Sequence, residues 1–161
     1  MRTLSSTLNA RQKTLTFTAL FKIQLTYGAN DITYDQSRII SMDHIEQVYS
    51  QIATVVLHNA DKAVTTDYRG YKGVISYGMK TSAGDEYSAC APLWVTGQQS
   101  YSAQGRLTVS LTLKGLPDLL AEDKASEQYI EAAASGLTVK KLIERTLIGH
   151  LQPFAHFVSY P

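Results

Sequence analysis

The stretch Thr14–Tyr27 reads TLTFTALFKIQLTY and alternates between polar and apolar side chains over nearly its whole length. Its apolar residues fall on one parity: Leu15, Phe17, Ala19, Phe21, Ile23, Leu25 and Tyr27. Only Leu20 breaks the alternation. Since successive side chains of a strand point to opposite faces of a sheet, this period of two predicts a strand with one buried face. The stretch exceeds the usual strand length of about five to six residues, so we expect a bend or bulge near Leu20, or two consecutive strands.

A second stretch, close to residue 110, has the same period of two. Its apolar residues Leu107, Val109, Leu111 and Leu113 alternate with Thr108, Ser110, Thr112 and Lys114. The pattern predicts a strand that buries the four apolar side chains and ends at Gly115.

The sequence between these two stretches holds shorter β-type segments. The predicted strands are Ile52–Leu57, Gly73–Met79 and Tyr87–Thr96, which are rich in β-branched or alternating apolar residues. Two polar segments, Lys62–Arg69 and Gly97–Gly105, are predicted loops.

Helical patterns lie at the two ends of the chain. Residues Thr3–Gln12 are predicted to form a short helix or an ordered arm. Ala121–Ala134 is predicted to be helical in part, and Thr138–Leu151 has apolar residues at helical spacing, with Pro153 beyond its end.

This order of elements, strands first and helices afterwards, is typical of an α+β domain. We expect an N-terminal arm or short helix over residues 1–12 and an antiparallel sheet or β-barrel-like domain over residues 13–115. A helical extension over residues 116–161 would follow, and we expect that it can lead to a downstream domain.

Composition excludes several classes of protein. The chain has 161 residues, with 15 Lys and Arg against 14 Asp and Glu, so its net charge of +1 gives no electrostatic signature of nucleic-acid binding. The single cysteine allows no internal disulfide. No apolar stretch is long enough to span a membrane, and residues 1–11 lack the apolar core of a signal peptide. A net charge this small also permits self-association.

The residues capable of catalysis form no recognisable motif. The four histidines, His44, His58, His150 and His156, have no zinc-type spacing. Cys90 falls on the predicted outward parity of a strand and has no partner motif. The acidic residues Asp31, Asp35, Asp43, Glu46, Asp118, Glu122 and Asp123 suit turn and cap positions. We therefore expect no catalytic, cofactor-binding or metal-binding residues, and no enzyme.

Ten tyrosines stand out in a chain of this size. Tyrosine supplies rigid contact area that is partly apolar and partly polar, and it is enriched at protein interfaces. Tyr68, Tyr71 and Tyr101 lie at or near the predicted loops, and we expect them to be interface residues. The alternative is that some tyrosines simply occupy positions in the sheet.

The order of strand signatures resembles a known family. The segments concerned are Arg38–Met42, Ala53–Asp61, Arg69–Gly78, Pro92–Val95 and Gly105–Gly115, with the helical pattern from Thr138 to Ile143 after them. Together they resemble the N-terminal β-domain of tail-hub or baseplate-type structural proteins of tailed bacteriophages. The resemblance implies a barrel-like or split-barrel fold that works by assembly, with copies of itself or with other phage tail proteins. It also implies a place in the virion after assembly in the host cytoplasm, as the N-terminal part of a longer protein.

Two other functions are compatible with the sequence. The first is a carbohydrate- or ligand-binding β-sandwich that uses tyrosines and Trp94 as a stacking platform. The second is a hydrolase that uses two carboxylates. Oligomers would favour the assembly module, and glycan binding by a monomer would favour the β-sandwich.

Overall fold

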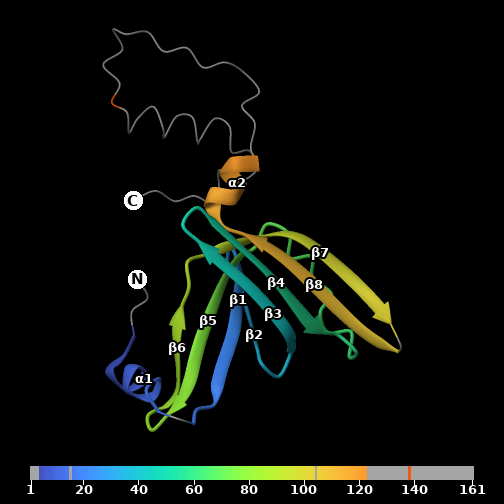
Figure 1. The fold of residues 1–161 in the computed structure, drawn as a ribbon. Helices are drawn as coiled ribbons and strands as arrows, with labels where there is room; N and C mark the ends of the chain where they lie inside the picture. Colours follow the sequence, from blue (N-terminus) through green and yellow to red (C-terminus); the bar gives the residue numbers. More distant parts are fainter. Residues whose placement is uncertain (1–3, 15, 104, 123–137, 139–161) are drawn as a thin grey trace.

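The computed structural model describes residues 4–14, 16–103 and 105–122, together with Thr138. This part of the chain is mostly antiparallel β-sheet with two short helices (Figure 1). In chain order the elements are α1 (Ser6–Arg11), β1 (Ala19–Tyr27), β2 (Asn30–Asp35), β3 (Ile39–Gln47), β4 (Ser50–His58), β5 (Lys72–Thr81), β6 (Gly84–Ala89), β7 (Leu93–Ala103), β8 (Arg106–Lys114) and α2 (Leu116–Glu122). The predicted antiparallel sheet is confirmed, whereas most of the C-terminal helical extension on which the predicted α+β class depended lies outside the described residues.

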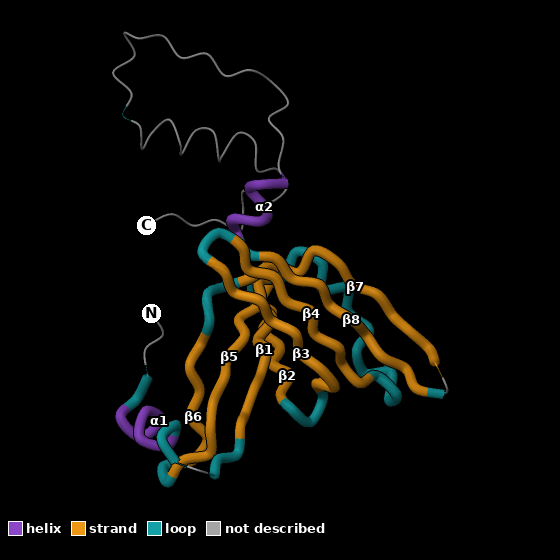
Figure 2. The backbone as a smooth tube through the Cα atoms, viewed as in Figure 1, coloured by secondary structure: helices purple, strands orange, loops and turns teal. Residues whose placement is uncertain are grey.

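The eight strands form one sheet in the order β2-β1-β5-β7-β8-β4-β3, with β6 paired to β5. The sheet curls so that β3 and β4 cross over β1 and β5 in the view of Figures 1 and 2. No ladder joins β2 to β3, so the sheet is open and does not close into a barrel. Three strands of the described sheet, β2, β3 and β6, therefore have one edge with no partner strand, and β7 pairs with β5 only at Leu93 and Trp94.

The core lies inside the curl, and the β4–β8 ladder is its centre. Ala53, Val55 and Leu57 of β4 pair directly with Leu113, Leu111 and Val109 of β8, and all six side chains are buried. Each large apolar side chain buried in this way stabilises the fold by roughly 1.5–3 kcal/mol. The predicted strand near residue 110 is confirmed, although Leu107 is only half-buried.

Strand β1 is shorter than the sequence indicated. Ile23 and Leu25 are buried on the expected parity, but Phe17 precedes the strand and is 51% exposed. The ladder to β5 runs without a shift from Ala19 to Thr26, so the expected bulge near Leu20 is wrong. Leu20 is itself buried, which explains why an apolar residue occupies the opposite parity there.

Two other predictions need correction. Residues 97–103, predicted as loop, continue β7 and pair with β8, because the ladder needs only backbone groups and tolerates polar side chains. Cys90, predicted to point outward, is buried in the core between β6 and β7, where its amide donates to the carbonyl of Ile75.

The helical ends of the chain are seen only in part. Helix α1 falls within the predicted arm, and Ser5 caps it by accepting a hydrogen bond from the Leu8 amide at 3.0 Å. Helix α2 begins directly after β8. The predicted helices over 121–134 and 138–151 lie outside the described residues, apart from residues 121, 122 and Thr138. In the described ranges, none of the helices has the length and apolar character that crossing a membrane requires.

Candidate functional site

The tyrosines expected at an interface lie in different environments. Tyr68 and Tyr71 belong to the hydrophobic core, with exposed fractions of 2% and 8%. Their rings meet edge to face with centroids 5.2 Å apart, and the Tyr68 hydroxyl lies 2.6 Å from that of Tyr34. Burial and this hydrogen bond raise the pKa of Tyr34. Tyr68 and Tyr71 therefore fasten their loop to the sheet, and their side chains have little area to offer another molecule.

Tyr101 is the third expected interface residue, and it is 51% exposed. It lies on β7, close to the turn that joins β7 to β8, and its hydroxyl donates to Gln99. Of the three residues, Tyr101 has the exposure that a docking surface requires.

Two side-chain amides hold the loop over residues 62–69 in place. Gln98 of β7 accepts a hydrogen bond from the Tyr68 amide at 2.8 Å and donates another to the Thr66 carbonyl at 3.0 Å. Asn59 does the same for Val64, accepting from its amide at 2.8 Å and donating to its carbonyl at 3.1 Å. An amide side chain can do both at once because it carries a donor and an acceptor.

The sequence offered histidine, cysteine and acidic side chains as candidates for catalysis or metal binding. In the part of the chain that the structure describes, no group of three or more His, Cys, Asp or Glu side chains could hold a metal ion. Asp35 accepts hydrogen bonds from the Ser37 amide at 2.9 Å and from its hydroxyl, which is the expected turn role and lowers the pKa of Asp35. His150, His156 and Asp123 lie outside the described residues.

Trp94 does not form an open stacking platform. Its side chain is only 6% exposed, and its indole Nε1 is buried with no hydrogen-bond partner. A sugar ring would need access to the face of the indole, and burial denies that access.

A chain of three hydrogen-bonded polar side chains crosses the interior of the curl. The side-chain Nε2 of Gln51 in β4 lies 3.1 Å from Nε2 of His44 in β3. Nδ1 of the same imidazole ring lies 3.1 Å from the Tyr77 hydroxyl in β5. With the Gln51 Nε2 as donor, His44 Nε2 accepts, so Nδ1 carries the proton and donates to Tyr77. The arrangement connects opposite sides of the curled sheet and orders its interior.

The most exposed apolar surface of the described chain lies on the β3–β4 hairpin. Val48 and Tyr49 form its two-residue turn, and they are 85% and 83% exposed. Just behind the turn, Ile45 and Ile52 face each other across the ladder and are 50% and 38% exposed. We call these four residues the apolar turn. Two-residue turns usually hold glycine, asparagine or aspartate, so valine and tyrosine here are not explained by turn geometry.

Asp118 of α2 holds the start of β4, directly after the turn of this hairpin. Its carboxylate accepts a hydrogen bond from the backbone amide of Gln51 at 2.6 Å and another from the Ser50 hydroxyl at 2.8 Å. These hydrogen bonds, the one from the backbone amide first, lower the pKa of Asp118. The Gln51 carbonyl in turn accepts from the Gly115 amide at 2.6 Å, so the start of β4 is held from two sides.

A cavity of about 340 Å³ lies beside the apolar turn. Its walls include Val48 and Gln51 from the hairpin, Trp94 from β7 and Pro117 from α2. The turn and the cavity therefore form one continuous surface at the end of the molecule where Figure 1 shows α2. This surface is the candidate functional site.

The sequence prediction selected other residues as candidates for an interface, because it followed tyrosines near polar loops. One signal was available: Val48 and Tyr49 are adjacent apolar residues between Gln47 and Ser50, where alternation would call for a polar residue. The β3–β4 hairpin was not predicted, because the polar residues Asp43, His44 and Glu46 suggested that the strand is interrupted after Met42.

Comparisons with known proteins add no family. No protein-family model matches the chain, and no curated protein is significantly similar to it.

Proposed function

We propose that this chain is a structural assembly module, which joins other protein subunits through the apolar turn of its β3–β4 hairpin, in the tail of a bacteriophage. The proposal names no chemical reaction. The module would contribute shape and contact surface, as hub, baseplate or tube components do.

The exposure of Val48 and Tyr49 carries the proposal. Soluble monomers seldom present a contiguous group of large apolar side chains, and such groups mark contact sites with other molecules. Burying each of these side chains in a partner is worth roughly 1.5–3 kcal/mol before the costs of association. The Asp118 anchor supports this use, because a hairpin that is held beside its turn loses less freedom on binding.

The tail of a bacteriophage is the setting that the order of strand signatures supports. An open sheet with three free strand edges is also compatible with assembly, because an unpaired edge can accept a strand from another chain. The net charge of +1 offers little long-range repulsion between copies.

Sedimentation velocity of the whole chain across a wide concentration range tests the proposal. We expect the weight-average sedimentation coefficient to rise with concentration, and the double variant Val48→Ser/Tyr49→Ser to abolish that rise. Tyr101→Ser is the matched control, because it removes an exposed tyrosine from a different surface. An unchanged rise in the double variant would contradict the proposal.

A further inference from the structure

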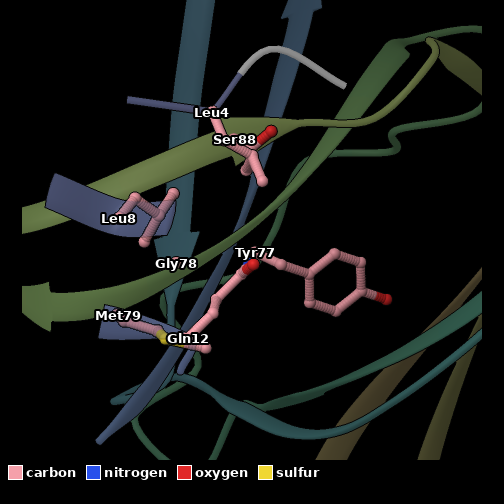
Figure 3. A pocket seen from close by; sticks show the side chains of 7 residues that line it. All are labelled: Leu4, Leu8, Gln12, Tyr77, Gly78, Met79 and Ser88. Atoms are coloured by element: carbon pink, nitrogen blue, oxygen red, sulfur yellow. The ribbon is translucent and has the colours of Figure 1, made fainter. Parts of the chain in front are cut away.

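An apolar cavity lies between α1 and the β5–β6 hairpin (Figure 3). Its volume is about 220 Å³, and its walls include Leu4, Leu8 and Met79. Leu8 is buried, whereas Leu4 is 39% exposed. In Figure 3 the ring of Tyr77 points away from the other labelled side chains, so the aliphatic residues supply most of a lining that also includes Gln12 and Ser88.

Hydrogen bonds to β6 hold the wall of this cavity in place. The hydroxyls of Ser5 and Thr7 both donate to the carboxylate of Glu86, the latter at 2.6 Å. These bonds lower the pKa of Glu86. A six-residue helix is not stable alone, so its attachment to β6 is what forms the cavity before any partner arrives.

The cavity and the apolar turn lie at opposite ends of the molecule. Figure 1 shows α1 beside the lower end of β6, whereas the turn between β3 and β4 lies at the upper end, next to α2. The contacts agree, since α1 packs against β5 and α2 packs against β4. One copy therefore cannot fill its own cavity with its own turn.

The two surfaces match in size. An apolar cavity of about 150 Å³ can hold a benzene molecule, so 220 Å³ is enough for the phenol ring of Tyr49. Both surfaces are apolar and partly exposed, and neither is covered by another part of the described chain.

The charges near the two surfaces are mostly opposite in sign, and the exception is Glu86 at the cavity, whose carboxylate is bonded to the hydroxyls of Ser5 and Thr7. Glu46 is exposed three residues before Tyr49, and Asp43 is exposed on the same strand. At the cavity, Arg11 and Lys13 flank Gln12, which lines it. The positive charges of Arg11 and Lys13 would attract the exposed carboxylates of a second copy at short range.

We propose that the chain associates head to tail, with the apolar turn of one copy seated in the α1 cavity of the next. This inference rests on the proposed function and names the partner as a second copy. Such a contact is heterologous, because it joins two different surfaces, so it builds rings or rows of copies. A symmetric dimer would instead join turn to turn and leave the α1 cavity unused.

Mixing two variants tests the inference. Val48→Ser/Tyr49→Ser removes the turn and keeps the cavity, and Leu4→Glu places a charge at the cavity and keeps the turn. We expect neither variant to self-associate and a mixture of the two to form one-to-one pairs in sedimentation velocity. Met79→Gln is a second cavity variant in case Leu4→Glu disturbs α1, and Tyr101→Ser is the control that should associate like the wild type.

The outcomes separate this inference from the proposed function. If both cavity variants associate like the wild type while the turn variant does not, the head-to-tail contact is overturned and the assembly role of the turn stands. A mixture that forms no pairs overturns it as well. If the turn variant associates like the wild type, the proposed function and this inference are both overturned.

Discussion

Two valines of the same hairpin show how differently sequence and structure account for apolar residues. Val55 in β4 lies opposite Leu111 and is fully buried, whereas Val48 at the turn is 85% exposed. Val55 belongs to the β-branched pattern of a predicted strand, so the ladder and the core explain it. Val48 belongs to no such pattern, and the two-residue turn holds it away from the interior. The difference separates residues that stabilise the fold from residues that remain available for contact with another molecule.

The largest expected effect is at the centre of the buried ladder. Leu111→Ala should lower the free energy of unfolding by roughly 2–5 kcal/mol, because it removes buried methyl groups and leaves a cavity. Chemical denaturation monitored by circular dichroism measures the change. A free energy equal to that of the wild type would show that the β4–β8 ladder is not the core.

A smaller effect is expected in the tyrosine cluster. Tyr68→Phe keeps the ring but removes the hydroxyl that lies 2.6 Å from the Tyr34 hydroxyl, so it should cost about 1 kcal/mol of stability. The same denaturation experiment measures the loss. Tyr101→Phe serves as the control and should cost nothing measurable, since that side chain is half exposed.

The Asp118 anchor should make stability depend on pH. Hydrogen bonds lower the folded-state pKa of Asp118, so its contribution is present above the unfolded value of about 3.9 and is lost as pH falls through the folded pKa. Asp118→Asn should therefore be less stable than the wild type at neutral pH, and the two should converge in acid. Chemical denaturation at neutral pH and in acid measures the free energies of unfolding of both proteins. Asp43→Asn is the matched control, and a similar convergence for it would remove the special role of Asp118.

The smallest effect on stability is expected at the apolar turn. Val48→Ser/Tyr49→Ser should change the free energy of unfolding of the monomer by no more than about 0.5 kcal/mol, because both side chains are exposed. Thermal denaturation at low concentration measures it. A loss comparable to that of Leu111→Ala would mean that the turn serves the fold and would erase the contrast between Val48 and Val55.

The sequence predicted the fold well where alternation was clean. Leu111 and Ile23 are buried on the parities that their strands indicated. It failed for residues 97–103, since a strand made of polar residues has the composition of a loop. It also placed Cys90 on the wrong face, because the parity of a strand cannot be extended beyond its end.

The candidate site was harder to predict than the fold. Tyr68 and Tyr101 are chemically identical, and only the three-dimensional structure shows that one is buried and the other exposed. The cavity beside α2 depends on Trp94 and Pro117, which lie far apart in sequence. No local pattern encodes such a meeting, because the order of strands in the sheet brings it about.

The burial of Cys90 makes its thiol a reporter of local opening of the structure. Cys90 is buried in the core, and its backbone amide donates a hydrogen bond to the carbonyl of Ile75 in β5. Its thiol therefore reacts with an alkylating reagent only when the structure around it opens. Since the chain has one cysteine, every labelled molecule reports one opening event at one place. The rate of labelling in buffer without denaturant therefore measures how often the junction between β6 and β7 separates from the sheet. Comparing the labelling rate in free and assembled samples would show whether association slows local opening far from the contact.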